Sequence, residues 1–285
     1  MRRSAILVPL VFLAAANAFG FALGRSGAGL AAATLARDQF RADIGGGTVA
    51  GANGSFGGVR REINWDGVAD AFAAPNNLPA NFFNVNSPRG VVFSTPGTGF
   101  QVSATAASGT PVRFGNINPT YPAEFKTFSA ERLFTPLGSV VTDIDFFLPG
   151  TNIPATVSSF GVMFSDNDGF ETRIDLFGPG GVSLGSISPL PADKDVSFVG
   201  ITLTGPGPTG IAHVRITSGN MILAPGNNAP DAFGVFPPAQ PPDLVTMDDF
   251  IYSEPVISGA VPAMSAPILL LLAASLLGIG VCARR

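Results

Sequence analysis

The sequence predicts an all-β protein, an antiparallel β-sandwich, and three observations support this prediction. Short segments recur in which apolar and polar residues alternate, which is the period of a strand with one buried face. Clusters of turn-forming residues separate these segments, and the chain contains 35 Gly and 25 Pro. Helical patterns of about 10–15 residues do not separate them, so nothing supplies the crossovers of a parallel sheet. We expect jelly-roll connections between the strands.

The first expected element is a signal helix over residues 1–18. Two arginines precede an apolar stretch of signal-peptide length, and Ala16 and Ala18 form the small-x-small pattern that signal peptidase cleaves. The alternatives are a cut nearer Ala22, an uncleaved anchor or a short buried helix. We expect cleavage, because the charge, the length and the cleavage motif agree.

Residues 19–58 are expected to form a short helix followed by a flexible glycine-rich segment. Ala36, Phe40 and Ile44 are four residues apart and predict a helix over residues 34–45. The stretch GGGTVAGANGSFGG that follows is too rich in glycine for a regular element.

The β-sandwich is expected over residues 59–256. Its strands are predicted at 61–68, 90–96, 100–105, 139–147, 160–165, 171–177, 196–203, 211–217 and 245–252. The segments at 171–177 and 211–217 each have one polar face. His213 and Arg215, for example, lie opposite Val214 and Ile216, which is typical of an antiparallel sheet with one face in water.

The last expected element is a hydrophobic helix within residues 261–285. The run from Ala266 to Cys282 has no charged residue and is close to the minimum of about 17 residues that span a bilayer. Arg284 and Arg285 follow, where cations hold a chain end on the cytoplasmic side. A buried core helix is the alternative, but the run is apolar on every face. With a signal peptide in front, we expect the body outside the membrane.

This C-terminal stretch resembles the sorting signals of bacterial exosortase substrates, the PEP-CTERM group and its relatives. The resemblance rests on Val261, Pro262, Ser265, the apolar helix and the terminal Arg284 and Arg285. It implies that a membrane cysteine protease removes the tail and that the protein reaches the cell surface or the extracellular matrix. The sequence departs from the group in having VPAMS in place of Pro-Glu-Pro, and only two basic residues.

Composition and charge exclude several classes of protein. Only 13% of the residues are charged, and the hydrophobic content of 46% excludes wholesale disorder. Lys126 and Lys194 are the only lysines, which argues against a nucleic-acid partner. The single cysteine, Cys282, lies in the tail, so the body has no disulfide and no cysteine nucleophile. Without both ends, 12 Lys and Arg remain against 20 Asp and Glu, an acidic balance of −8.

The body also resembles a group of extracellular bacterial all-β proteins for which no activity is established. The resemblance covers roughly residues 36–254 and rests on NWDG, FSTPGTGFQVS, FGVMFSDNDG, HVRITSGN and VTMDDFIY, in that order. Such relatives commonly end in the same kind of sorting tail. The resemblance implies one extracellular domain and no particular chemistry.

The sequence contains one candidate site for Ca²⁺, which prefers oxygen ligands. The first four candidate ligands are close together, at Asp166, Asn167, Asp168 and Glu171. Further candidates are Asp66, Asp248 and Asp249, if they lie close in space. Asp249 shares its expected strand face with apolar residues, where a carboxylate requires a partner. A polar hairpin turn at 166–171 is the alternative.

Catalytic residues are not evident in the sequence. His213 is the only histidine, no GxSxG motif accompanies it, and its polar strand face favours an ordinary exposed histidine. Asp143 and Asp145 share a face and leave a carboxylate-based hydrolase open. Sugar-binding sites usually stack the sugar ring on Trp or Tyr side chains. This chain has only Trp65 and two tyrosines, and its 24 Phe are expected in the core.

Together these observations predict a non-enzymatic protein, secreted or held at a bacterial cell surface. Its expected role is structural or adhesive in the envelope or the exopolysaccharide matrix. Its expected partners are signal peptidase, a membrane sorting protease, polysaccharide and, through its C-terminal helix, the membrane. The first alternative is a calcium-dependent carbohydrate-binding module, and the second is a glycan hydrolase that uses carboxylates.

Overall fold

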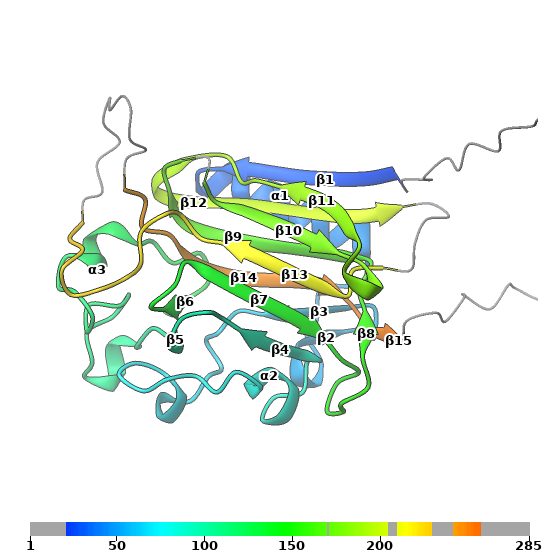
Figure 1. The fold of residues 1–285 in the computed structure, drawn as a ribbon, viewed down its shortest axis with the longest axis horizontal. Helices are drawn as coiled ribbons and strands as arrows, with labels where there is room; N and C mark the ends of the chain where they lie inside the picture. Colours follow the sequence, from blue (N-terminus) through cyan, green and yellow to red (C-terminus); the bar gives the residue numbers. More distant parts are fainter. Residues whose placement is uncertain (1–20, 170, 205–209, 230–241, 258–285) are drawn as a thin grey trace, which may run out of the picture.

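The computed structural model describes residues 21–169, 171–204, 210–229 and 242–257 (Figure 1). The expected signal peptide with Ala16 and Ala18 and the expected sorting tail over 261–285 lie outside these residues. Among the residues that the structure describes, none of the helices combines the length and the apolar composition that a membrane span requires.

Two antiparallel sheets form the body. The larger sheet contains β1 (Phe21–Ala28), β12 (Ala192–Thr204), β9 (Ser159–Asn167), β14 (Thr246–Ser253), β3 (Arg60–Ile63) and β2 (Ser55–Phe56), in this order, and β6 (Phe134–Leu137) pairs with both β14 and β5 (Gly99–Val102). The smaller sheet has the order β11 (Ser183–Ile187), β10 (Arg173–Phe177), β13 (His213–Thr217), β7 (Val141–Phe146) and β4 (Val91–Ser94). A short ladder joins β15 (Val256–Ile257) to β8 (Ala155–Thr156).

The main hydrophobic core lies between the two sheets. The larger sheet contributes Phe160, Phe164 and Phe250 among others, and the smaller sheet contributes Ile144 and Val214. Each of the nine predicted strand segments overlaps a strand of these sheets, although β3 ends at Ile63 and so covers only the first part of the predicted 61–68. The structure therefore confirms a mostly β protein built from antiparallel sheets.

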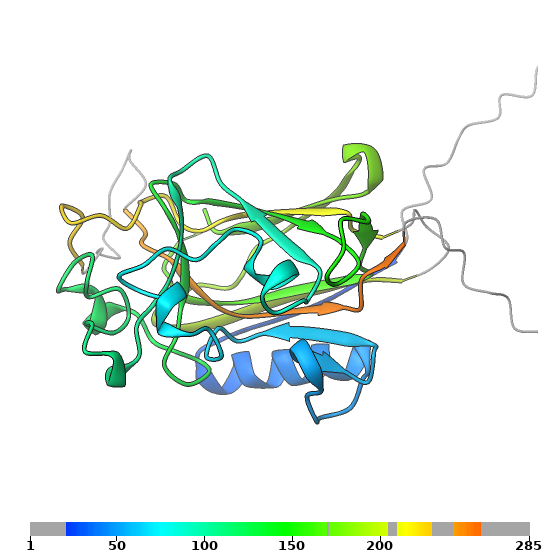
Figure 2. The ribbon, with the colours of Figure 1, turned by 90° about the horizontal axis from the view of Figure 1, so that it is seen from below.

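A helix covers the outer face of the larger sheet. Helix α1 (Leu30–Ile44) buries Ala33, Ala36 and Phe40 against a second apolar cluster on that face (Figure 2). Gly161 and Gly200 lie beneath Phe40, where an added Cβ atom would come within 3 Å of its ring. These glycines let the helix approach the sheet closely. The predicted helix is confirmed, and it begins four residues before the expected start.

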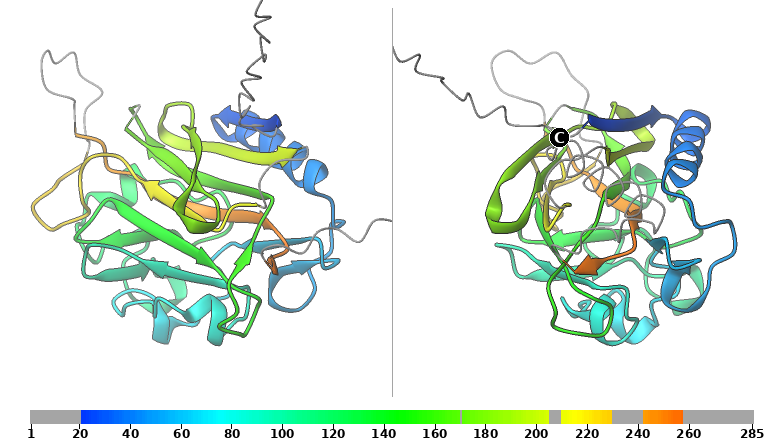
Figure 3. Two further views of the ribbon diagram at one scale, coloured as in Figure 1. Left: turned by 45° about the vertical axis from the view of Figure 1, so that its right-hand side comes forward. Right: turned by 90° about the vertical axis from the view of Figure 1, so that its right-hand side faces the viewer.

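The sandwich extends beyond the expected boundary at residue 59. β1 pairs with β12 along its whole length (Figure 3). β2, which lies within the expected flexible segment, pairs with β3. The Arg60 guanidinium, 2% exposed, donates to the carbonyls of Gly45 and Gly47 and so ties the glycine-rich segment to the sheet. Residues 21–58 are thus part of the folded body.

Short helical turns complete the structure. They are η1 (Ala52–Gly54), η2 (Asp70–Phe72), α2 (Phe82–Val85), η3 (Ala106–Ser108), α3 (Tyr121–Glu124) and η4 (Pro179–Gly181). The η4 turn lies in the connection between β10 and β11 and contributes to the site described below.

A β-bulge changes the expected faces of β14. Simple alternation placed Met247, Asp249 and Ile251 on one face, but the pairing with β9 shifts between Met247 and Phe250. Met247 and Phe250 therefore both belong to the core between the sheets, and Ile251 packs in the cluster beneath α1. The bulge inserts Asp248 and Asp249 between them, which a sequence period of two does not reveal.

Candidate functional site

The outer face of the smaller sheet brings together four charged side chains. Asp145 lies opposite His213 in the register of β7 and β13, and Asp143 lies opposite Arg215. The neighbours in sequence, Ile144 among them, point into the core. The prediction that these polar residues share one wet face is confirmed.

His213 is held between two carboxylates. Its Nδ1 lies 2.8 Å from Oδ1 of Asp145, and its Nε2 lies 3.1 Å from Oδ1 of Asp143. Both ring nitrogens therefore face acceptors, which favours the imidazolium with two N–H donors. The hydrogen bond to Asp145 and the nearby negative charges raise the pKa of His213, while partial burial opposes them.

Arg215 completes this network. Its Nε donates to Oδ1 of Asp143 at 2.7 Å, and a terminal nitrogen donates to Oδ2 of Asp143 at 3.0 Å. Asp143 thus accepts from both His213 and Arg215. Asp145 has a single partner among the residues that the structure describes, and its side chain is 50% exposed.

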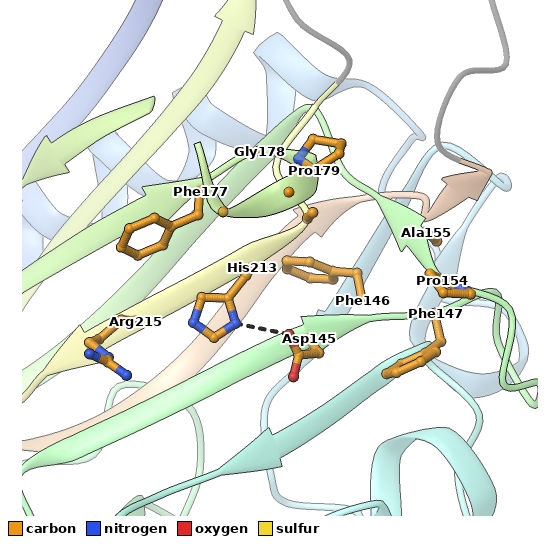
Figure 4. A pocket seen from close by; sticks show the side chains of 13 residues that line it. Asp145, Phe146, Phe147, Pro154, Ala155, Phe177, Gly178, Pro179, His213 and Arg215 are labelled. Atoms are coloured by element: carbon orange, nitrogen blue, oxygen red, sulfur yellow. Dashed lines mark hydrogen bonds and ion pairs between the residues drawn. The ribbon is translucent and has the colours of Figure 1, made fainter. Parts of the chain in front are cut away.

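A pocket of about 680 Å³ lies beside this network (Figure 4). His213 and Asp145 lie between the ring of Phe177 on one side and the ring of Phe147 on the other. The η4 turn forms a further wall, together with Pro154 and Ala155. The volume is within the range of about 300–1,000 Å³ typical of small-molecule sites.

Sequence reasoning missed two of these pocket residues. It placed all phenylalanines in the core, whereas Phe147 and Phe177 are only partly buried and line the pocket. A signal was present for Phe177, because Arg173, Asp175 and Phe177 alternate on one strand face. An aromatic residue in the polar register of a strand is a candidate for ligand contact.

A second cluster contains three of the proposed metal ligands, Asp66, Asp248 and Asp249. Ser129 donates its hydroxyl to Oδ1 of Asp248 at 2.8 Å, and the N–H of Phe128 donates to Oδ2 at 2.6 Å. Asp66 accepts the N–H of Arg132 at 3.2 Å and also interacts with Ser129. Burial is the main cause that raises the pKa of all three carboxyl groups.

Asp249 borders a buried ion-pair network. Its Oδ2 is 4.0 Å from the guanidinium of Arg41, which pairs more closely, at 2.5 Å, with Glu62. Arg60 also donates to Glu62, at 2.7 Å. Asp249 is 3% exposed, and its Oδ1 has no hydrogen-bond partner among the described residues. Asp249 also shares a hydrogen bond with the Asp248 carboxyl group, and Arg41 would balance a negative charge on Asp249 only in part.

The other proposed ligands lie elsewhere. Asp166 and Asn167 belong to β9, so they are not at the tip of a hairpin. Carboxylate oxygens of Asp166, Glu124 and Asp193 lie within 4.8 Å of one another, a group that sequence reasoning did not assemble. The ammonium group of Lys194 is 3.4 Å from Glu124 in the same place.

Asp168 and Glu171 belong to neither group. The main-chain N–H of Asp168 donates to Asp243 at 3.2 Å, and Glu171 lies two residues before β10, partly exposed. The seven proposed calcium ligands are therefore distributed over separate places. The group around Asp166 is the only one of the described residues with three acidic side chains close enough to share an ion.

The fold and the pocket define a mostly β antiparallel protein with a polar site on the outer face of one sheet. The chain matches no protein-family model, and no curated protein matches its sequence.

Proposed function

We propose that the chain is an exported, non-enzymatic β-sandwich protein with jelly-roll connections and an adhesive role at a bacterial cell surface or in its exopolysaccharide matrix. The observation that carries this proposal is the pocket beside His213, whose charged groups bond mainly to one another. Asp143, which would serve a hydrolase, already accepts from Arg215 and His213. Such a site favours holding a ligand over cleaving it.

Adhesion is tested by co-sedimentation. The purified full-length chain, mixed with exopolysaccharide from the cells that make it, is expected to sediment with the polymer. A chain that stays in the supernatant under all salt conditions contradicts the adhesive role. Release of reducing ends during the incubation would favour the hydrolase instead.

Export and processing complete this proposal. We propose signal-peptidase cleavage after Ala18 and removal of the tail near Ala260 by a membrane sorting protease. The VPAMS segment and the apolar run after it support this step. Intact-mass spectrometry of the protein recovered from the cell surface is expected to give a chain without both ends. A mass that retains Cys282 contradicts removal of the tail.

A calcium-dependent form of the same function is the second candidate. The acidic group of Glu124, Asp166 and Asp193 favours it, because hard cations select carboxylate oxygens. Lys194 competes with a cation for these oxygens. On this alternative, calcium raises the melting temperature and EDTA lowers it. Melting curves that coincide in calcium and in EDTA contradict the calcium-dependent form.

A further inference from the structure

We infer that the pocket beside His213 binds an uncharged pyranose unit of a polysaccharide through Asp145 and the aromatic rings of Phe147 and Phe177. This inference rests on the proposed adhesive function and specifies its ligand. It follows from three properties of the pocket, namely its aromatic sides, its one available carboxylate and its balanced charge.

The aromatic sides suit the shape of a sugar ring. A pyranose has an apolar face of C–H groups and a rim of hydroxyl groups. Phe177 and Phe147 are partly exposed and lie on opposite sides of the polar centre (Figure 4). The Phe177 ring also contacts the His213 ring, with centroids 5.6 Å apart, which fixes its position. The glycines of the η4 turn add no side chains that would obstruct this space.

The available carboxylate oxygen suits the hydroxyl rim. Oδ1 of Asp145 faces His213, and no donor among the described residues bonds to its Oδ2. A carboxylate accepts hydrogen bonds from neighbouring hydroxyls, and hydrogen bonds to a charged acceptor are stronger than those to a neutral one. Because the imidazolium of His213 orients Asp145, the acceptor is in place before a ligand arrives.

The balanced charge favours an uncharged ligand. Two carboxylates, Asp143 and Asp145, face the guanidinium of Arg215 and the ring of His213, and both ring nitrogens lie against carboxylate oxygens, as in an imidazolium. An anionic sugar would have to displace Asp143 from Arg215 and would approach Asp145, in a chain whose net charge is −4. An amino sugar would approach both His213 and Arg215. An uncharged sugar ring, which carries only hydroxyl groups, neither has to displace Asp143 nor brings a like charge toward these side chains.

Calorimetric titration of the full-length chain tests this inference. The probes are neutral gluco-, galacto- and manno-oligosaccharides, anionic galacturonate oligomers and cationic glucosamine oligomers. At least one neutral series is expected to bind, and the charged series are expected to bind at least tenfold more weakly. Asp145→Asn and Phe177→Leu are expected to weaken binding of the neutral series about tenfold or more.

Asp175→Asn is the matched control, since Asp175 lies on the same sheet face but does not line the pocket. It should bind as the unmodified chain does, and melting temperatures establish that each variant folds. Phe177→Ala is the second variant if Phe177→Leu retains too much contact. Unchanged binding in both the Asp145 and the Phe177 variants overturns the inference.

The inference and the proposed function fail in different ways. Co-sedimentation with the native matrix but no binding of any neutral series overturns the uncharged pyranose and leaves adhesion intact. Tighter binding of a charged series also overturns it. Loss of both co-sedimentation and oligosaccharide binding overturns the adhesive role as well.

Discussion

Trp65 donates its indole N–H to the main-chain carbonyl of Asp248 at 2.7 Å, and this bond joins the aromatic core to the bulge of β14. The same indole stacks on Phe134, with ring centroids 4.1 Å apart and planes only 2° from parallel. Trp65 is 1% exposed. The position of the acidic pair Asp248 and Asp249 therefore depends on the packing of one aromatic side chain.

Trp65→Phe is expected to lower the free energy of unfolding by about 2 kcal/mol or more, because it removes buried aromatic contact and leaves the Asp248 carbonyl without its donor. Urea denaturation followed by far-ultraviolet circular dichroism measures this, since Trp65 is the only tryptophan. Val85→Ala, at an exposed site, is the control and should change stability by less than about 0.5 kcal/mol. Equal losses in the two variants contradict the role of Trp65.

Asp249→Asn is expected to stabilise the protein at pH 8. Burial is the main cause that raises the pKa values of both Asp248 and Asp249, and the charge of Asp249 adds to the effect on Asp248. For Asp249, hydrogen bonds from Asp248 and Ser129 and the charge of Arg41 oppose the rise, and Glu62 adds to it. A group with a raised pKa binds a proton more tightly in the folded state. The contribution of this group to the stability of the folded state is fully present below the ordinary aspartate pKa of about 4. It is lost as pH rises through the folded-state pKa.

Thermal unfolding between pH 4 and pH 9 measures this effect. The unmodified chain should lose stability as pH rises through this window, and Asp249→Asn should lose less, by about 1 kcal/mol or more at the alkaline end. Asp38→Asn, at an exposed position on α1, is the control and should follow the unmodified chain. A stability profile of the unmodified chain that rises with pH would falsify the assignment.

Arg60→Met is expected to destabilise the protein by about 3 kcal/mol. Arg60 is buried, and its loss removes donors from Glu62, Gly45 and Gly47 at once. In the Arg60→Met variant, amide hydrogens around residues 45–47 should exchange faster than those of the core strands. Arg173→Met removes an exposed ion pair and should cost about 1 kcal/mol or less. Similar losses in both variants would show that Arg60 does not organise this segment.

The titration of His213 is measurable directly, because it is the only histidine in the chain. Nuclear magnetic resonance is expected to give a pKa above the ordinary value of about 6.5, since the ring faces Asp145 and Asp143, with Arg215 and Phe177 beside them. A group with a raised pKa stabilises the folded state when it is protonated. The stabilisation from His213 is therefore present below about pH 6.5 and is lost as pH rises through the raised pKa. Asp145→Asn should lower the pKa, and Asp175→Asn should leave it nearly unchanged. A pKa at or below the ordinary value contradicts the arrangement.

Local patterns predicted much of the fold and little of the sites. The nine strand segments, the helix that carries Phe40 and the shared face of His213 and Arg215 all follow from periodicity. β1 was missed because FALGRSGA lacks a clear alternation, and it is a strand through its pairing with β12. The grouping of Asp166 with Glu124 and Asp193 was missed because these residues are brought together from three segments of the chain.

The sequence by itself determined the class of fold, many of the turns and the polar side of strands such as β10 and β13, because these depend on the period of neighbouring residues. The tertiary structure alone decided which polar residues meet. A bulge in β14 interrupted the alternation at Asp248 and Asp249, and the register of β7 with β13 put Asp145 opposite His213. Both outcomes depend on pairing between distant strands, and such pairing leaves no local signal in the sequence.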